Sequence, residues 1–446
     1  MLLLNEYAST FAELAWGQWL VYFLIGSGIY FLLRSKLVPF RYIPHAFEVL
    51  LGRHKSKTDV GDVSSFKALA ASLSGTIGLG NIAGVAVAIQ IGGPGAIFWM
   101  WITAIFGIAT KFFTCSLSVM YREVGPDGET LAGPMYVVKN GLPRFMLPLA
   151  YFFAFFGMIG CMSAFQSNQI VQITQDLYFS GIENFEYFAA VFLMLITSLV
   201  ILGGLQRIAE VSSWLVPFMA SLYFVAVVLA ILVEIDSFLP SLGLIFSEAF
   251  NFDSAVSGGI AGVIITGVRR GAFSNEAGIG TEAMIHGAAK TSHPVKQGLV
   301  AMTGPIFDTL IMCTLTAILI LVSGVWQQSD SNGVTLTAEA FSATLGPLGS
   351  VILFMCVLSF GCSTIFTQSH YGSACARFLF GKKAIKPYRY FVILSVGIFS
   401  VVSIDFALNI IDGAFAMMAI PTLISGLWLA PKVLAKSDEY FSSIKN

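Results

Sequence analysis

Charged side chains are scarce in this chain of 446 residues. Only 11% of the residues are Asp, Glu, Lys or Arg, whereas 56% are hydrophobic, and the mean hydropathy is +0.81. A soluble domain of this size would leave far too much apolar surface in water, so the composition excludes one and favours a membrane protein. The net charge of -1 also argues against a nucleic-acid partner.

Motifs that identify common enzymes are missing as well. The sequence contains no HExxH and no GxSxG pattern, and its five histidines are scattered. The six cysteines show no CxxC spacing and lie in or beside apolar stretches, which is typical of small buried side chains. We therefore expect no enzyme activity and no cofactor, and a polytopic membrane enzyme or a channel is the alternative to a carrier. The N-terminus lacks the basic start of a signal peptide, so the first apolar stretch should remain in the protein.

Long apolar runs dominate the sequence. A helix needs about 20 mostly apolar residues to cross the hydrocarbon core of a bilayer. Runs of this kind predict an all-α polytopic membrane protein with about eleven transmembrane helices. The predicted spans are residues 16–33, 66–92, 95–120, 145–170, 187–203, 210–233, 257–287, 296–324, 345–374, 388–404 and 406–430.

The basic residues fall on alternate connections between these spans. Of the 24 Lys and Arg residues, 21 lie in one set of connections, at the span ends beside them or in the tail, three lie deep within spans, and none lies in the intervening loops. Cytoplasmic loops of membrane proteins carry the excess of Lys and Arg. We therefore expect a multi-pass protein of a bacterial-type inner (plasma) membrane, with the N-terminus outside and the C-terminus in the cytoplasm.

Two spans differ from the others because glycine and polar residues interrupt them at mid-membrane depth. They are residues 66–92 and 257–287, which stand five spans apart. An offset of five spans inverts one repeat relative to the other, as in transporters whose site lies at broken helices. The predicted parts are an N-terminal helix with a basic cytoplasmic connection (1–65), a first five-helix repeat (66–233), a second, inverted repeat (257–430) and a cytoplasmic tail (431–446).

The interruptions would supply binding groups for a zwitterion. Unpaired backbone groups are costly in hydrocarbon, so an unwound segment indicates a cavity or a ligand. Amides after Gly78 and Gly80 would face a carboxylate, while carbonyls of the preceding half-helix would face an ammonium group or a cation. The other candidates at this depth are Thr76, Asn81, Phe273, Ser274 and Asn275. The alternative is that the glycines only allow close helix packing.

A candidate sodium site combines the first interruption with the ninth predicted span. Ser363 and Thr364 carry hydroxyls, which are hard oxygen ligands of the kind Na⁺ prefers. Both could face the backbone carbonyls between Leu73 and Thr76. We therefore expect Leu73, Thr76, Ser363 and Thr364 to hold Na⁺. The alternative is that both hydroxyls bond to carbonyls one turn back in their own helix.

Further polar residues lie within the spans. Gln166 belongs to a polar cluster in the fourth span, which is either a substrate contact or a helix end near the outer surface. A charge at the bilayer centre costs at least about 2.5 kcal/mol, so we expect deep cations and carboxylates to pair with one another. The deep charges are Lys111, Arg269, Arg270, Glu276, Glu282 and Asp308.

Five ordered motifs resemble the alanine or glycine:cation symporter family. They are GTIGLGNIAG (75–84), GGPGAIFWM (92–100), GPMY (133–136), GAFSNEAG (271–278) and HPVKQG (293–298). The similarity runs over about residues 13–430. It implies a LeuT-like fold of ten core helices plus one N-terminal helix. It also implies uptake of a small neutral amino acid such as alanine or glycine, with Na⁺ as the coupling ion.

The same resemblance implies roles within the candidate site. Thr76, Gly78 and nearby amides would bind the substrate carboxylate, and Gln166 and Thr364 would lie near the amine. Gln368 stands where the family generally has a tryptophan that lines the side-chain pocket. An amide leaves a roomier and more polar pocket, so we also expect room for a more polar substrate such as serine or glutamine. We expect the protein to function as a monomer in the bilayer.

Overall fold

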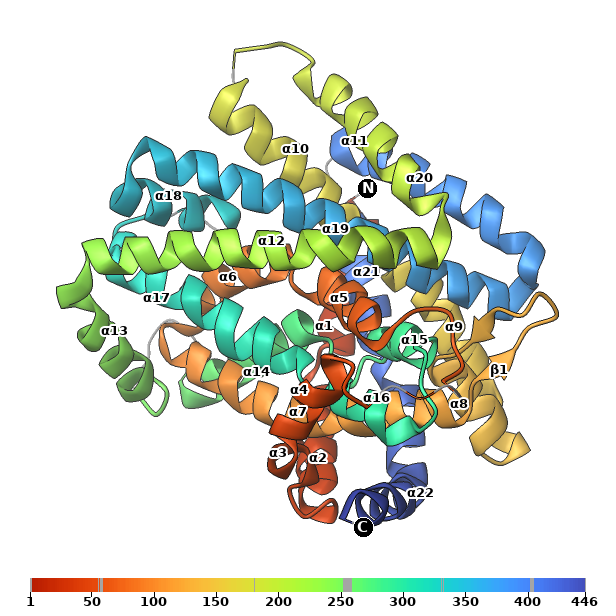
Figure 1. Cartoon of the computed structure of the whole chain (residues 1–446). Coiled ribbons are helices and arrows are strands. Elements are labelled where there is room, and N and C mark those ends of the chain that lie inside the picture. Colours follow the sequence, from red (N-terminus) through yellow and green to blue (C-terminus); the bar gives the residue numbers. More distant parts are fainter. Residues whose placement is uncertain are drawn as a thin grey trace.

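The computed structural model describes residues 2–54, 56, 59–179, 181–251, 259–329, 331, 333–401 and 405–445. Strands in these residues are limited to one antiparallel hairpin, β1 (Glu123–Val124) with β2 (Thr130–Leu131), and two isolated bridges. Nearly all of the remaining described chain is helical (Figure 1). The predicted all-α class is confirmed.

The first half of the chain contains both long helices and short connecting ones. Its helices are α1 (Leu2–Ala15), α2 (Gln18–Arg34), α3 (Val38–Arg41), α4 (Ile43–Leu50), α5 (Ser65–Thr76), the π-helix η1 (Gly80–Gly84), α6 (Val85–Gly92), α7 (Gly95–Met120), α8 (Pro134–Gly141), the 3-10 helix η2 (Arg144–Met146), α9 (Pro148–Gly160), α10 (Ala164–Tyr178), α11 (Phe185–Ile201) and α12 (Gly204–Val233).

The second half is organised in the same way. Its helices are α13 (Ile235–Glu248), α14 (Ile260–Asn275), α15 (Thr281–Gly287), α16 (Pro294–Ala301), the π-helix η3 (Ile306–Cys313), α17 (Thr314–Val322), the 3-10 helix η4 (Val325–Gln327), α18 (Val334–Leu345), α19 (Pro347–Phe380), the 3-10 helix η5 (Lys382–Ala384), α20 (Ile385–Val401), α21 (Asp405–Met417) and α22 (Ala419–Lys445).

Eight helical runs among the described residues are long and apolar enough to cross a membrane. They are Leu4–Arg34, Gly95–Met120, Arg144–Tyr178, Gly204–Val233, Pro294–Val322, Pro347–Phe380, Lys382–Val401 and Leu408–Ile444. The pair Ser65–Thr76 and Gly80–Gly92 forms a ninth if it is one span bent by 52°. The chain is therefore a membrane protein with several transmembrane helices.

Each of the eleven predicted ranges contains a helix, but two of these helices are shorter than a full span. The apolar helix α11 has 17 residues, and α14 ends at Asn275, before the separate helix α15. Parts of two predicted spans, 257–258 and 402–404, lie outside the described residues. The count of eleven spans and the inverted layout of the repeats remain predictions.

Two helices extend beyond their predicted spans. The fourth predicted span does not end near residue 170, because α10 continues to Tyr178. The predicted tail from residue 431 is part of α22, which continues to Lys445. Both extensions are amphipathic, and a boundary judged by hydropathy alone stops where polar residues begin.

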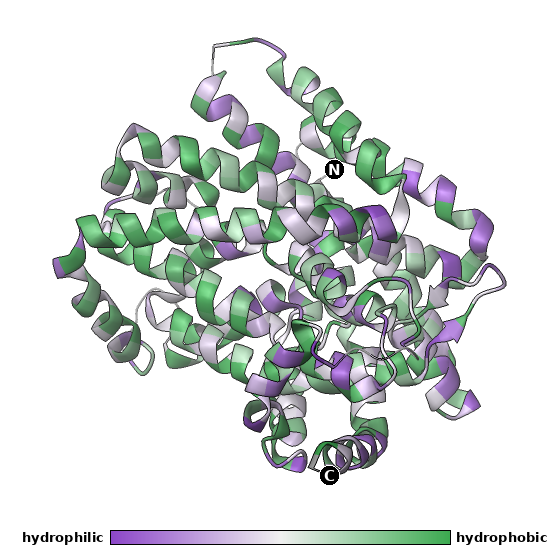
Figure 2. Ribbon diagram, viewed as in Figure 1, coloured by the Kyte–Doolittle hydropathy of each residue, from purple (hydrophilic) through white to green (hydrophobic). Residues whose placement is uncertain are grey.

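Apolar side chains cover much of the outside of the helical bundle. Figure 2 shows hydrophobic residues along outer helices such as α12 and α13. Individual side chains on the outer helices are largely exposed, among them Phe188 of α11 at 73% and Leu239 of α13 at 74%. Patches of this size on a soluble surface would be a liability, whereas lipid covers them without cost.

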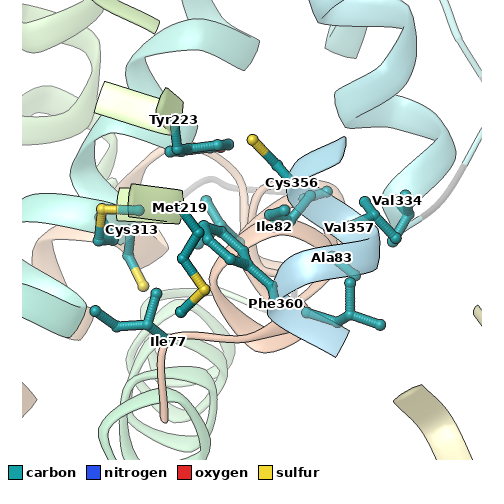
Figure 3. Close-up of a cluster of buried hydrophobic side chains, with 14 of the residues drawn as sticks. Ile77, Ile82, Ala83, Met219, Tyr223, Cys313, Val334, Cys356, Val357 and Phe360 are labelled. Carbon is teal, nitrogen blue, oxygen red and sulfur yellow. The ribbon is translucent and has the colours of Figure 1, made fainter. Parts of the chain in front are cut away.

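The interior behind the first bent helix is tightly packed. Ile77, at the bend, lies in a buried cluster with Met219 of α12, Cys313 of η3 and Phe360 of α19 (Figure 3). The Tyr223 hydroxyl, which would be costly to bury unpaired, lies 2.6 Å from the Thr316 hydroxyl. The irregular backbone at the bend is therefore enclosed by protein rather than exposed to lipid.

Candidate site between two broken helices

The first break lies between α5 and η1. Helix α5 ends at Thr76, and η1 begins at Gly80. A Cβ atom at Gly78 would lie 2.5 Å from Thr364 Oγ1 of α19, so only glycine fits there without displacement. The Gly78 amide donates to Asn81 Oδ1 at 2.8 Å. Asn81 thus caps the break, and this amide is already occupied by the protein itself.

The second break separates α14 from α15. After Asn275 the backbone takes positive φ angles at Glu276 (56°), Gly278 (89°) and Gly280 (96°), which ends the helix. Asn275 Oδ1 accepts a hydrogen bond from the Ala277 amide at 2.9 Å. The interruptions predicted in both helices are therefore present, and an asparagine side chain stabilises each one.

Asp308 of η3 connects the two breaks. Its carboxylate accepts hydrogen bonds from Asn81 Nδ2 (2.7 Å), Ser274 Oγ (2.8 Å) and Thr309 Oγ1 (2.7 Å). All four side chains are buried. Asp308 was expected only as a member of an ion pair. The sequence does place this carboxylate deep in a predicted span, and a carboxylate at that depth needs several hydrogen-bond donors.

A cavity lies where the breaks meet. The space open to the centre of a water molecule is about 40 Å³, which admits a few waters or a ligand of few heavy atoms. Seven of the ten predicted substrate residues line it, namely Thr76, Gly78, Gly80, Gln166, Phe273, Thr364 and Gln368. The other three, Asn81, Ser274 and Asn275, stand behind this lining and hold the breaks together. The lining also includes two carboxyl side chains that were not predicted as site residues, Glu276 and Asp412.

A third helical run, formed by α9 and α10, is also interrupted beside the cavity. Helix α9 ends at Gly160 and α10 begins at Ala164, so Gln166 lies in the first turn of α10, at a helix end that is buried rather than near the surface. Ser163 in this interruption donates to Gln368 Oε1 at 3.0 Å. Gln368 therefore both lines the cavity and bonds to a neighbouring helix.

Two of the four predicted sodium ligands, Ser363 and Thr364, contact α5. Ser363 Oγ and Thr364 Oγ1 lie 3.3 and 3.2 Å from the Ser74 carbonyl oxygen, and each lies 2.9 Å from the Phe360 carbonyl oxygen of its own helix. Each hydroxyl thus lies near a carbonyl of α5 and also near a carbonyl one turn back in its own helix, so both of the predicted arrangements are present. The Leu73 carbonyl accepts the Ile77 amide at 2.7 Å, and the Thr76 side chain faces the cavity.

The six deep charges do not form the expected pairs. Among the described residues, no salt bridge within 4.0 Å involves any of them. Hydrogen bonds from neutral side chains take the place of ion pairs, as at Asp308 and at Glu276, which accepts from Thr281. Neutral donors satisfy a carboxylate without a second desolvated charge, so the packing does not require matched cations.

The cavity adjoins a larger vestibule on one side. The vestibule, about 460 Å³, lies towards the loops without basic residues, and it shares Gly80, Phe165, Phe273, Leu408 and Asp412 with the cavity. A second space of about 410 Å³, the basic-side cavity, lies on the opposite face and is lined by residues including Arg377 and Arg389. It shares no lining residue with the central cavity.

Arg122 joins two chain segments on the basic side. Its guanidinium donates to the carbonyls of Val60 (2.8 Å), Gly287 (3.1 Å), Ala289 (2.8 Å) and Thr291 (3.2 Å). Residues 60–63 precede α5, and residues 287–291 begin at the last residue of α15. The same two segments also pair through backbone bridges. One side chain therefore joins the basic-side ends of both broken helices, and we call this contact the Arg122 latch.

Comparison with known proteins agrees with this arrangement. The sodium:alanine symporter family matches residues 1–446. The sodium/alanine symporter AgcS of Methanococcus maripaludis is 38% identical over 445 residues, covering 98% of this chain and 97% of that protein. The probable sodium/glutamine symporter GlnT of Bacillus subtilis is 32% identical over 432 residues, covering 96% of this chain and 89% of that protein.

The fold is also similar to a solved structure. MhsT in complex with L-phenylalanine matches with a TM-score of 0.56 and 14% identity, covering 84% of this chain and 98% of that chain. This likeness concerns the fold alone. The named relatives are transporters, so the expectation that the chain is not an enzyme is confirmed. Together with the motifs predicted to carry the resemblance, the full-length match establishes that the chain belongs to the sodium:alanine symporter family.

Proposed function

We propose that this protein imports a small neutral amino acid together with Na⁺, by alternating access, across a bacterial-type inner membrane with its N-terminus outside. The observation that carries the proposal is the cavity at which both broken helices meet. Backbone groups released at the breaks face a space that protein encloses, and irregular backbone at membrane depth is tolerated where it lines such a space.

The size and chemistry of the cavity favour a substrate such as alanine, glycine or serine. The cavity admits few heavy atoms, and the relatives include named symporters of alanine and of glutamine. The carboxylate would lie against the break at Gly78 and Gly80, beside Thr76. The amine would lie near Thr364 and Gln166. The amide of Gln368 would face the side chain and favour a polar one.

The hydroxyls of Ser363 and Thr364 support sodium coupling. A hydroxyl has one proton, and in each case the nearer acceptor is Phe360 O. Once that proton is used, the contact with Ser74 O brings two oxygen atoms together with no hydrogen between them. A cation placed there would stabilise both oxygens, so we expect Na⁺ at this point, near Leu73 and Thr76.

The test is uptake by the purified protein in proteoliposomes. Labelled alanine should accumulate when a sodium gradient is imposed and should exchange with unlabelled alanine inside the vesicles. A channel would show no such exchange against a gradient, and an enzyme would alter the label chemically. Equal uptake with and without sodium, across a panel of neutral amino acids, would contradict the coupling.

A further inference from the structure

Two histidines and a glutamate converge at the cytoplasmic end of the molecule as the charge distribution orients it, far from the cavity. His45 and Glu48 lie one turn apart on α4, and His54 follows that helix. His45 Nδ1 and His54 Nε2 both point at the same carboxylate oxygen, Glu48 Oε2, at 3.2 and 3.1 Å. The three candidate ligand atoms all lie within 4.8 Å of one another. Nothing in the proposed transport function uses this cluster.

The spacing of these atoms fits a transition metal. Zinc lies about 2.0–2.2 Å from imidazole nitrogen and carboxylate oxygen in tetrahedral sites, which places neighbouring ligands roughly 3.3–3.5 Å apart. The two nitrogen–oxygen distances of 3.2 and 3.1 Å are already close to that edge. Side chains exposed by 12% (His45), 33% (His54) and 44% (Glu48) leave room for a water as a fourth ligand.

The surroundings orient His45 as a ligand. Its second nitrogen, Nε2, lies 2.9 Å from the hydroxyl of Tyr440 on α22. When Nδ1 binds a metal, Nε2 carries the proton and donates to that hydroxyl, and such an outer contact is typical of metal-bound histidine.

Two charged residues near the cluster have hydrogen-bond partners other than Glu48. The amine of Lys296 on α16 donates to the His54 carbonyl at 2.9 Å. Glu439 of α22 accepts from Lys436. Glu48 therefore keeps its carboxylate directed at the two imidazoles, and hydrogen bonds from His54 and His45 hold its pKa below the ordinary value.

We propose that His45, Glu48 and His54 form a binding site for a divalent transition metal of the Zn²⁺ class at the cytoplasmic ends of α4 and α22. Through the bond from His45 to Tyr440, a bound ion fixes α4 against α22. Tyr440 also stacks on His293, at 4.9 Å between ring centres, and His293 caps α16. The site thus lies where three cytoplasmic elements meet, and metal binding should stabilise their contact.

The experiment is a titration of tag-free purified protein with Co²⁺, followed by competition with Zn²⁺. Tetrahedral Co²⁺ bound to His45, His54 and Glu48 gives intense visible absorption bands, whereas the aqueous ion gives weak ones. We expect one site per chain, displaced by Zn²⁺. His54→Ala and Glu48→Gln should each weaken binding at least tenfold, and Tyr440→Phe should weaken it by about tenfold through loss of the outer contact.

Matched variants keep the result interpretable. Glu439→Gln removes a nearby cytoplasmic carboxylate that bonds to Lys436 and is not part of the cluster, so it should bind Co²⁺ as the wild type does. Zn²⁺ should raise the melting temperature of the wild type and of Glu439→Gln, but not of the His45→Ala/His54→Ala double variant. The proposal is overturned if the double variant, shown folded by its elution as a single species, binds Co²⁺ as tightly as the wild type does, or if no tetrahedral bands develop.

Discussion

Gly78 occupies a position where a single methyl group should matter. A Cβ atom there would approach Thr364 Oγ1 to 2.5 Å, and relieving such a contact costs about 1–3 kcal/mol. We expect Gly78→Ala to weaken substrate binding by roughly tenfold to a hundredfold, because 1.4 kcal/mol corresponds to a tenfold change. Binding of labelled alanine to the purified variant measures the effect.

Gly84 offers a control within the same broken helix. A Cβ atom at Gly84 meets nothing within 4 Å, and its backbone is helical with φ of -64°. Gly84→Ala should therefore leave substrate binding unchanged and slightly stabilise the helix. If both variants bind alanine equally well, the first break does not form the site.

Gln368 should determine how well polar substrates compete. Its amide lines the cavity, and its oxygen accepts from Ser163. We expect serine to compete with labelled alanine at least as well as glycine does in the wild type. Gln368→Leu keeps the approximate size of the side chain but removes the amide, so competition by serine should weaken severalfold while alanine binding is retained.

The partner of Gln368 needs its own control. Gln368→Leu leaves the Ser163 hydroxyl without its acceptor, and an unpaired buried group costs about 1–3 kcal/mol. The double variant Ser163→Ala/Gln368→Leu removes both groups and separates this cost from selectivity. Gln172→Leu, on the exposed face of α10, tests for general effects of losing an amide. Identical competition profiles in all four proteins would show that Gln368 does not select the substrate.

The sequence alone identified residues that line the cavity, but not the side chains behind the lining that hold the breaks together. Glycine and hydroxyl residues in apolar runs are unusual enough to mark Thr76, Gly78 and Thr364. The donors that surround Asp308 come from three separate elements, and no spacing in the sequence brings them together. The roles of Asn81 and Ser274 as connections, rather than cavity lining, likewise depend on tertiary packing.

At the level of helices, the contact of α19 with α5 should govern sodium dependence. Removing both hydroxyls in Ser363→Ala/Thr364→Val takes away two oxygen ligands beside Ser74 O. We expect the sodium concentration for half-maximal uptake to rise by about tenfold or more, and that for substrate to change much less. Uptake measured over a range of sodium concentrations decides this.

Ser359 provides a matched control on α19. It is exposed and donates to the Met355 carbonyl one turn back at 2.7 Å, so Ser359→Ala removes the same kind of helix-internal bond without touching α5. Sodium dependence should remain as in the wild type. Full uptake by the Ser363→Ala/Thr364→Val variant at wild-type sodium concentrations, or by the wild type with a proton gradient alone, would refute the assignment.

The Arg122 latch should hold the basic side of the transporter closed. Hydrogen bonds to a charged group contribute about 1.5–3 kcal/mol each, and Arg122 makes four. Arg122→Gln loses most of them, so we expect the population open on the basic side to rise by at least tenfold. Reaction of Ala374→Cys, in the basic-side cavity, with a maleimide should accelerate accordingly.

Two comparisons isolate this effect. Arg122→Gln without the introduced cysteine shows whether the buried Cys375 becomes reactive, and Arg144→Gln removes an exposed arginine elsewhere on the same face. If the Ala374→Cys variant reacts with the maleimide at the same rate whether or not it also carries Arg122→Gln, the backbone bridges close this side without the latch.

Across the whole molecule, the native cysteines offer a simple test of orientation. All six are free and buried, so the wild type should not react with a membrane-impermeant maleimide. Gln328→Cys, in an exposed loop after η4, should react in intact cells. Ser443→Cys, exposed on α22, should react only after permeabilisation. The reverse pattern would invert the proposed topology.

The sequence pattern predicted where helices occur better than it predicted where each helix begins and ends. Hydropathy found a helix in every predicted range, because lipid-facing and buried helices are both apolar. It could not detect the interruption at Ser163 or the extension of α10 to Tyr178, since these depend on packing against α19 and α20. The Arg122 latch was equally hidden, because its acceptors are backbone carbonyls that any residue could supply.

The vestibule beside the central cavity has a pharmacological consequence. Phe165 and Phe273 border both the cavity and the vestibule. An amino acid with a long, rigid side chain could place its backbone groups at the breaks while the side chain passes between these rings into the vestibule. Such a compound would prevent the rings from closing over the site, so it would bind as a substrate does and yet not be carried. Blockers of this protein should therefore be extended substrate analogues, applied from the vestibule side.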